Sequence, residues 1–303
     1  MDTLFQDVRY AARKLLRTPG FTLVAVVTLA LAVGATTAIF SVVNGVLLKP
    51  LPFRDPERLV LVSSTNRDGK MNAMSALDFI DYRDQSHGYV GMAQMDVGNV
   101  NLARSGTPPM RLNAARVGAR FFELLGVRPE LGRAFVAGDD ATGAPRIAIL
   151  SDALWRGRFG ADSQVVGRLV SLDGEQYTVV GVAPPSLRFP RTPDVWLPYV
   201  WQPWEMDPQN RGAHSIQAVA RVKPGVTIES ANREVATIAE RLAKQYPESN
   251  TGFGGQVQPL QEQMVGRARP ALLAMLGASA FVLLIACANV ANRLLVRAAA
   301  RVS

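Results

Sequence analysis

Residues 21–48 read FTLVAVVTLALAVGATTAIFSVVNGVLL, a run that contains no charged side chain. A second uncharged run, ALLAMLGASAFVLLIACANVAN, fills residues 271–292. Each run exceeds the ~20 residues that an α-helix needs to cross a hydrocarbon core of ~30 Å. Residues 49–270, which lie between the runs, have the mixed composition of a folded water-soluble domain. The sequence therefore predicts a large domain held between two membrane-spanning helices.

Basic residues flank both runs on the sides that face away from the domain. Residues 1–20 carry a net charge of +2 and residues 291–303 carry +3, out of a formal +8 for the chain. Since cytoplasmic flanks are enriched in Lys and Arg, we expect both ends in the cytoplasm and the domain outside it. Arg267 and Arg269, outside the second run, weaken this contrast slightly. The domain sequence has no basic stripe of the kind that nucleic acid requires, so no nucleic-acid partner is expected.

A cleaved signal peptide is the alternative interpretation of the first run, because Ala30-Leu31-Ala32 has the small-x-small form of a cleavage site. The run continues to Leu48, whereas a secretory apolar region usually has ~7–15 residues, which favours a retained helix. The single cysteine, Cys287, lies in the second run. No intramolecular disulfide can form, so the domain must be stable through packing alone.

The segments beside and within the spans have patterns of their own. Residues 1–19 have apolar side chains at helical spacing and predict an amphipathic helix on the inner membrane surface. Small residues recur every fourth position at Ala30, Gly34 and Ala38, and at Ala274 and Ala278. Such faces allow helices to approach closely in lipid, so we expect other helices to pack there, although a high alanine content would also produce the pattern.

The domain begins and ends with the same strand–helix–strand order, in residues 57–117 and 212–262. The first copy has strands at 59–63 and 89–97 around a helix at 76–85, for which Ser75 and Asp78 form a capping-box pattern. The second copy has strands at 215–222 and 256–260 around a helix that starts after Thr227 and runs to about Tyr246. Two β-α-β units on either side of an insertion predict a split, ferredoxin-like α/β sandwich.

The insertion covers about residues 118–211 and predicts a smaller α/β subdomain. Helices are expected at 121–125 and 152–159, and strands at 146–150, 169–172 and 177–182. Asp173-Gly174 joins the last two strands as a hairpin turn. The aromatic and proline-rich segment from Trp196 to Trp204 is either a packed edge or an exposed contact surface.

Catalytic patterns are absent from the sequence. It has no G-x-x-x-x-G-K-[ST] loop to hold nucleotide phosphates and no G-x-S-x-G nucleophile elbow. His87 and His214 lack the neighbouring His or Cys that zinc requires. Asp139-Asp140 and the helical group Asp78, Asp81 and Asp84 are the acidic clusters, and the latter is expected to be a solvated face. The sequence thus predicts no enzyme, no catalytic, cofactor-binding or metal site, and no cofactor.

Several short blocks of the chain resemble one family. They are DALWRGRFG (152–160), VVGR (165–168), LDG (172–174), YTVVGV (177–182), DVW (194–196), FFELLGV (121–127) and LGR (131–133). Together these resemble the periplasmic core of MacB-like ABC transporter permeases. ANVAN (288–292) with its basic tail resembles the start of an FtsX-type membrane domain. DVRYAARK (7–14) and NGVLLKPLP (44–52) resemble the branch called duplicated orphan permeases.

The resemblance implies a mechanotransmitting permease in the bacterial inner membrane. ATP binding and hydrolysis on a separate cytoplasmic subunit would move the membrane helices, and the domain would transmit that motion to a periplasmic envelope partner. A homodimer or pseudo-dimer of permease halves in membrane lipid is expected. Members of the family continue through at least two further membrane helices, so the chain, which stops at Ser303, resembles the N-terminal fragment of a longer permease.

The overall expectation is an α+β chain with five segments: 1–19, an amphipathic helix; 20–48, a membrane helix with a stalk; 49–270, the periplasmic core; 271–292, a second membrane helix; and 293–303, the start of a basic cytoplasmic segment. The leading functional hypothesis is the membrane subunit of an ABC-type export or envelope-remodelling system. The alternatives are a membrane-anchored periplasmic scaffold or regulator without transport, and an extracytoplasmic sensor. Further membrane spans after Ser303 would favour a permease, and a soluble output domain would favour a sensor.

Overall fold

The computed structural model describes residues 19–104, 107–266 and 268–299. The chain divides into two compact units, one formed by the two terminal segments, up to Lys49 and from Val265, and one formed by Pro50–Met264. Most of the predicted amphipathic helix, residues 1–18, lies outside the described residues.

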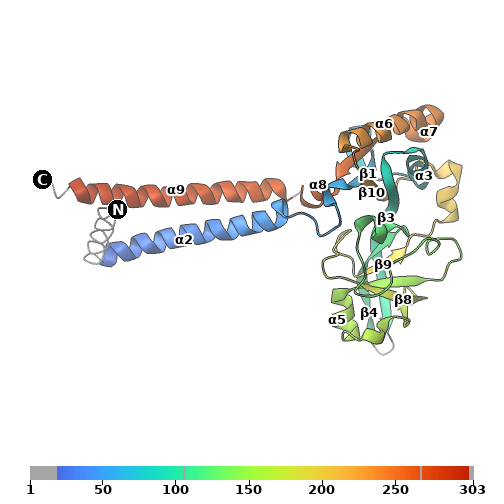
Figure 1. The fold of residues 1–303 in the computed structure, drawn as a ribbon, viewed down its shortest axis with the longest axis horizontal. Coiled ribbons are helices and arrows are strands. Elements are labelled where there is room, and N and C mark those ends of the chain that lie inside the picture. Colours follow the sequence, from blue (N-terminus) through green and yellow to red (C-terminus); the bar gives the residue numbers. More distant parts are fainter. Residues whose placement is uncertain (1–18, 105–106, 267, 300–303) are drawn as a thin grey trace. The chain divides into compact units, whose positions relative to one another are not determined.

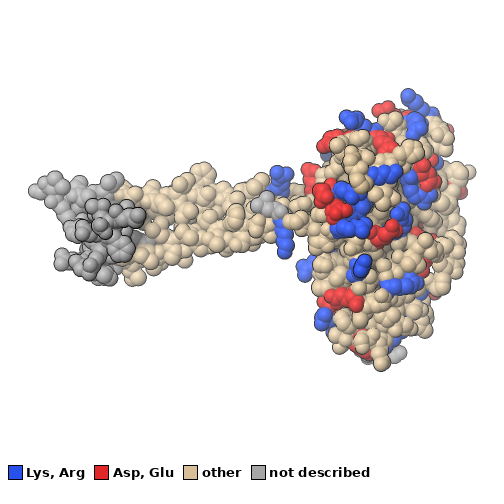
Figure 2. All heavy atoms as spheres, viewed as in Figure 1, with Lys and Arg blue, Asp and Glu red and all other residues tan. Residues whose placement is uncertain are grey.

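The terminal unit consists of two long helices that run antiparallel, side by side, drawn blue and red in Figure 1. Helix α2 (Pro19–Val43) continues into the π-helical turn η1 (Asn44–Leu48), and helix α9 spans Arg269–Ala299. The stretches Thr22–Val43 and Arg269–Asn292 are long and apolar enough to cross a membrane. Figure 2 shows the described surface of this pair free of charged side chains along most of its length. Both predicted apolar helices are therefore confirmed as elements of the fold.

The contact between α2 and α9 follows a seam on each helix. Its least exposed positions recur at alternating spacings of three and four residues, as in a coiled coil. On α2 they are Leu29, Ala32, Thr36, Ile39 and Val43, and on α9 they are Leu272, Leu276, Ser279, Leu283, Ala286 and Val290. The Thr36 hydroxyl reaches the backbone carbonyl of Ser279 at 3.4 Å across the seam.

The small-residue faces predicted from the sequence do not form this seam. Ala30, Gly34 and Ala38 are exposed on α2, and Ala274 and Ala278 are exposed on α9. The seam positions repeat every 3.5 residues on average, as in a heptad. A pattern that repeats every four residues therefore drifts off the seam within two helical turns. The contact between the two spans therefore uses other faces, and the packing of further helices on the small-residue faces stays a prediction.

The unit Pro50–Met264 is built on one sheet, which has eleven strands among the described residues, in the order β11-β1-β10-β3-β4-β9-β6-β8-β5, with β2 beside β1, and β7 beside β3 and β8. The strands are β1 (Leu59–Thr65), β2 (Met71–Asn72), β3 (Tyr89–Arg104), β4 (Thr107–Val117), β5 (Leu131–Gly132), β6 (Ile147–Ser151), β7 (Leu169–Leu172), β8 (Glu175–Ala183), β9 (Val195–Pro198), β10 (Gln217–Val222) and β11 (Gly254–Pro259). The mixed α/β fold class predicted from the sequence is thereby confirmed.

The helices of this unit are α3 (Ala76–Gln85), α4 (Phe121–Leu125), α5 (Asp152–Phe159), α6 (Ile228–Gln245), α7 (Pro247–Asn250) and α8 (Leu260–Val265), with the short turns η2 (Pro56–Arg58), η3 (Ser163–Val165), η4 (Pro203–Met206) and η5 (Pro208–Asn210). Side-chain caps explain where three of them begin. Ser75, Ser151 and Thr227 each accept a backbone N–H three residues ahead, at 3.1 Å. Such caps satisfy amide groups that the first helical turn leaves unpaired.

Four strands and two helices form the predicted ferredoxin-like half. Its strands lie in the order β11-β1-β10-β3, which is fourth, first, third and second along the chain. Helices α3 and α6 cover one face, as Figure 1 shows. On that side Val60 and Val62 of β1 pack with Phe79, Val235 and Ile238 from the two helices. Leu59 and Leu61 point to the opposite face and join a second core with α4.

The predicted insertion adds its strands to the same sheet. Strand β3 continues well beyond the predicted end at residue 97, and β4 returns along it, with Val100 opposite Leu112. Strand β9 then pairs with β4 in parallel, and β7 pairs with the far end of β3. The hairpin turn Asp173-Gly174 has φ of 50° and 86°, as a type I′ turn requires.

Candidate functional site

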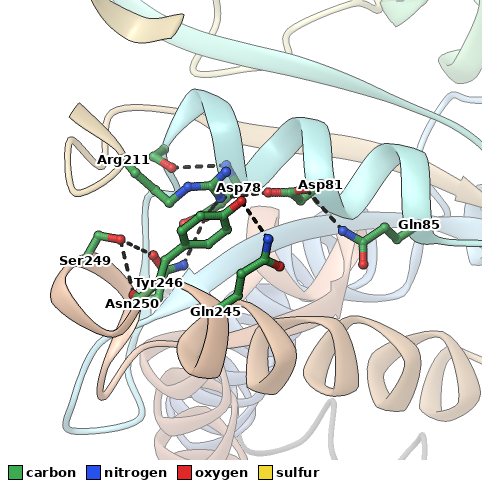
Figure 3. Close-up of polar contacts among 9 residues, drawn as sticks. Asp78, Asp81, Gln85, Arg211, Gln245, Tyr246, Ser249 and Asn250 are labelled. Carbon is green, nitrogen blue, oxygen red and sulfur yellow. Dashed lines mark hydrogen bonds and ion pairs between the residues drawn. The ribbon is translucent and has the colours of Figure 1, made fainter. Parts of the chain in front are cut away.

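The most buried charge cluster of the domain surrounds Arg211, on the segment that leads back to β10 (Figure 3). Its guanidinium donates to the carboxylates of Asp78 at 2.8 Å and Asp81 at 2.7 Å. Both acids lie on α3, one helical turn apart, so a single arginine reaches both. The side chains of Arg211 and Asp78 are 10% and 3% exposed, which makes this a buried ion pair rather than a surface one.

Residues at the end of α6 and on α7 complete the cluster, which we call the Arg211 clamp: Asp78, Asp81, Arg211, Tyr246 and Asn250. The Arg211 guanidinium carbon lies 3.8 Å from the centre of the Tyr246 ring, a cation–π geometry. The Asn250 amide donates to the Asp78 carboxylate at 3.0 Å. Three segments distant in sequence are thus held together: α3, the segment before β10, and α6 with α7.

Hydrogen bonds and opposite charge stabilise the buried groups of the clamp. Burial lowers the pKa of Arg211, but hydrogen bonds and attraction from Asp81 and Asp78 outweigh it and raise the pKa overall. Burial raises the pKa of the neighbouring Tyr82, and the charges of Asp78 and Asp81 raise it further. The clamp links the three segments through hydrogen bonds, ion pairs and a ring contact. It can fix the relative positions of three segments, which is a mechanical role.

A second buried arginine, Arg221, secures the first residues of the domain. It lies on β10 and donates to backbone carbonyls of Leu124 at 2.8 Å, Asp55 at 3.1 Å and Arg54. Burial and the nearby charge of Arg54 lower its pKa. Arg58 adds two hydrogen bonds to the carbonyl of Val222, at 2.9 and 2.8 Å. The segment before β1 is therefore bound to the interior of the sheet.

The two ends of the domain lie on neighbouring strands. Strand β1 pairs antiparallel with β11, and Val60 lies opposite Pro259. Leu260, which directly follows β11, is fully buried in the core that also contains Leu59 and Leu61. The Asn232 side chain on α6 accepts the N–H of Val257, on the side of β11 away from β1. A displacement of either chain end therefore acts on a strand pair that is anchored on both sides.

The acidic groups singled out in the sequence have partners within the protein. The prediction of a solvated face is wrong for Asp78, which is buried, and holds for the exposed Asp84, whose partner is Arg83 at 2.6 Å. Asp139 pairs with Arg133 at 2.6 Å, and Asp140 accepts the N–H of Ala119. The sequence could not show that a distant arginine would cover one end of the acidic face.

The two histidines occupy separate environments. His87 is exposed, whereas His214 is partly buried. The His214 ring Nδ1 lies 2.9 Å from the carbonyl of Ala73, and the ring is tilted against that of Phe253, with ring centres 4.5 Å apart. Among the described residues, no group of three or more His, Cys, Asp or Glu side chains could hold a metal ion. Cys287 is exposed on α9.

The segment Trp196–Trp204 contains both predicted alternatives. Trp196 is fully buried in the core, whereas Trp204 is 50% exposed. Between them, Tyr199 donates a hydrogen bond to Glu205 at 2.6 Å, and its ring is tilted against that of Trp201, with ring centres 5.0 Å apart. The segment is therefore a packed edge whose far end reaches the surface.

Sequence reasoning missed both buried arginines. Arg221 left a signal, because it interrupts the otherwise apolar strand AVARV (218–222), where an unpaired charge would be unfavourable. Arg211 left none, because it lies in the polar loop DPQNRG (207–212).

Comparisons with known proteins give one family and several similar structures. The family described as "MacB-like periplasmic core domain" matches residues 22–238. A domain of a protein described as a permease from Porphyromonas gingivalis is 16% identical, with a TM-score of 0.51, over 69% of this chain and 92% of that one, and so shares the fold. The search of curated proteins finds no match.

Two further solved structures were found. The periplasmic region of MacB from Actinobacillus actinomycetemcomitans is 14% identical, with a TM-score of 0.49, over 77% of this chain and 98% of that one. The extracellular domain of the noncanonic ABC-type transporter YknZ from Gram-positive bacteria is 13% identical, with a TM-score of 0.45, over 66% and 99% of the two chains.

Proposed function

This chain belongs to the family of the MacB-like periplasmic core domain, a family of ABC-type permeases, and on that premise we propose that it transmits ATP-driven motion from a separate cytoplasmic ATPase to its periplasmic domain. It is a membrane protein with a periplasmic domain. As a permease subunit it would serve an export or envelope-remodelling system.

The observation that carries this proposal is the placement of the two domain ends on the paired strands β1 and β11. A device that transmits motion needs its input at stiff, connected elements. Both ends meet this need, because Arg58 and Arg221 bind the incoming segment and the buried Leu260 fixes the outgoing one. The Arg211 clamp holds the helix layer over the same sheet.

The membrane unit supports the same proposal. Its two helices share a continuous seam from Leu29 to Val43 on one side and from Leu272 to Val290 on the other. Helices with such a seam move together more readily than apart, because separation would lose the packing along the whole contact. We propose that the exposed small-residue faces pack against further membrane helices, in a homodimer or pseudo-dimer of permease halves.

ATP hydrolysis is assigned to a partner subunit. The sequence has no phosphate-binding loop of the Walker type. We therefore propose that the chain is not an ATPase and that a separate cytoplasmic ATP-binding subunit drives it. We place both chain ends in the cytoplasm of a bacterial inner membrane, with an envelope partner on the periplasmic side.

A flexible insertion tests the proposal. Ten Gly and Ser residues are inserted after Lys49, where the domain unit begins. The insertion should leave abundance, membrane insertion and ATPase binding unchanged, but it should abolish the export or envelope-remodelling activity in cells. The matched control carries the same insertion after Gly143, in an exposed turn within the domain, and should keep its activity. Full activity with the insertion after Lys49 would contradict force transmission and favour a scaffold that does not transport.

A further inference from the structure

A small polar pocket lies where the loop that precedes β9 meets the ribbon formed by β3 and β4. It has a volume of about 130 Å³. Its polar lining is Asn99, Asn113 and Arg191, and its apolar lining includes Val97, Pro190 and Pro193. Among the described residues, no acidic side chain lines the pocket. A concave site with a few converging polar groups is the usual form of a small-ligand site.

The strand register places the two asparagines of this pocket side by side. Asn99 of β3 lies directly opposite Asn113 of β4. The Asn113 N–H donates to the Asp194 carboxylate at 2.8 Å, and its carbonyl accepts the Asp194 N–H at 2.8 Å. Because these backbone groups point away from β3, the two asparagines form the non-hydrogen-bonded kind of pair, in which facing side chains lie closest. Asp194 also fixes the loop before β9 against this pair.

The loop carries Arg191 in an unfavourable backbone conformation. Arg191 and Thr192 both have φ of 51°, in the left-handed region that residues other than glycine rarely adopt. The Thr192 N–H donates to the Arg188 carbonyl at 2.8 Å, and the following Pro193 is buried, so the turn is held in place. Arg191 and Thr192 are exposed, and glycine would adopt the same conformation without strain. Strained backbone of this kind clusters at ligand-binding sites, which is expected if the Arg191 side chain has a role.

The polar groups of the pocket are available to a ligand. Among the described residues, the side chains of Asn99, Asn113 and Arg191 make no hydrogen bond or ion pair with another group of the protein. A guanidinium is a planar fork of donors that matches the two oxygens of a carboxylate. Each asparagine offers both a donor and an acceptor. The last residue of a peptide presents the complementary set, a carboxylate and a nearby backbone N–H.

We infer that this pocket binds the C-terminal carboxylate of a peptide. Arg191 pairs with the carboxylate, and the carboxamides of Asn99 and Asn113 donate to it and accept the N–H of the last peptide bond. The pocket is small, so the terminal side chain that contacts its apolar wall is small as well. The inference goes beyond the proposed function, because this binding requires neither ATP nor motion of the domain.

Saturation-transfer NMR on the full chain in lipid nanodiscs tests the inference, with N-acetyl-alanyl-alanine as the probe and empty nanodiscs as the blank. The free acid should give a saturable signal. Its C-terminal amide should bind about tenfold or more weakly, because the charge-assisted hydrogen bonds are lost. Acetate and inorganic phosphate should also bind more weakly than the dipeptide acid, since neither presents a peptide N–H beside its charge.

Arg191→Gly separates binding from folding. The substitution removes the guanidinium and relieves the positive φ, so it should weaken binding of the acid by about tenfold or more while the urea midpoint stays the same or rises. Arg188→Ala is the matched control, because Arg188 is an exposed arginine of the same loop that does not line the pocket. It should bind the acid as the wild type does.

Four results would overturn the inference: no binding of the acid at millimolar concentration, an amide that binds as tightly as the acid, an Arg191→Gly chain that binds like wild type, or acetate or phosphate that binds at least as tightly as the dipeptide, which would assign the pocket to a small anion. The proposed function is tested separately, because these measurements contain no ATPase. A chain that binds the acid but transmits no motion would refute the proposed function alone.

Discussion

At the scale of single residues, the domain is held by charges that it buries. Arg211 donates hydrogen bonds to both Asp78 and Asp81, and Arg221 donates to three backbone carbonyls. Replacing a buried ion pair by apolar groups is often harmless, but removing one partner leaves the other charge uncompensated. These arginines therefore determine which segments stay together, even where their net contribution to stability is small.

Arg211→Ala tests the importance of the clamp. The substitution leaves the buried Asp78 carboxylate with the Asn250 amide alone, so we expect the free energy of unfolding to fall by about 3–5 kcal/mol. Urea unfolding of the full chain in detergent, followed by tryptophan fluorescence, measures the change. Arg83→Ala removes the exposed pair with Asp84 and should cost about 0–1 kcal/mol. Equal effects of the two substitutions would show that the clamp is dispensable.

Asp139 gives the domain a predictable response to acid. Burial alone would raise its pKa, but the hydrogen bonds from Arg133 and from the Val136 N–H outweigh burial and lower the pKa below its ordinary value of 3.8. A carboxylate with a depressed pKa in the folded state stabilises the fold above its unfolded pKa. The stabilisation disappears as the pH falls through the folded value.

Arg133→Ala should therefore reduce the loss of stability between pH 5 and pH 2, as measured by the urea midpoint at each pH. Arg146→Ala, which removes an exposed pair with Glu175, is the control and should leave that difference unchanged. An Arg133→Ala chain with the acid sensitivity of wild type would contradict the assignment.

At the scale of elements, the sequence predicted helices better than strands. The bounds of α3 and α5 agree with the prediction, because Ser75 and Ser151 are local caps and the helical period extends directly from them. Strand β4 was not predicted. It begins with Thr107-Pro108-Pro109, and prolines are unusual inside strands, so its pairing with β3 depends on contacts that a local pattern does not contain.

Long-range pairing also explains why the domain ends and the clamp were not foreseen. The antiparallel β1–β11 pair joins segments about 190 residues apart, as the hydrogen bond from Ser64 to Gly254 illustrates. The ferredoxin-like order could be inferred from two β-α-β patterns, but the position of Arg211 over α3 could not. Its only sequence context is a polar loop.

The helix seam gives a prediction with a matched pair of substitutions. Ala32 is 5% exposed in the seam, whereas Ala30 is exposed. In a Cys287→Ser background, Thr36→Cys and Ser279→Cys should form a disulfide between α2 and α9 under oxidation. Ala32→Leu overfills the seam, at a cost of about 1–3 kcal/mol, and should reduce the disulfide yield strongly. Ala30→Leu should not, and equal yields from both would contradict this seam.

At the scale of the whole molecule, membrane topology is the first expectation to test. The basic flanks predict that a topology reporter fused at Gly174 gives an extracytoplasmic signal. Reporters fused at either end of the chain should give a cytoplasmic signal. Gly174 lies in an exposed hairpin turn, so a fusion there should leave the domain folded. A cytoplasmic signal from Gly174 would refute both the topology and the proposed permease.

The central claim is that ATP moves the periplasmic domain, and pulsed electron paramagnetic resonance measures that motion. Cys287 is the only cysteine of the chain, so a Cys287→Ser, Thr142→Cys variant takes a single spin label in an exposed turn of the domain. The distance between labels on the two permease halves is recorded in nanodiscs with the ATPase bound. We predict that vanadate-trapped nucleotide shifts this distance, and that the insertion after Lys49 abolishes the shift. An unchanged distance in a complex that hydrolyses ATP would contradict mechanotransmission.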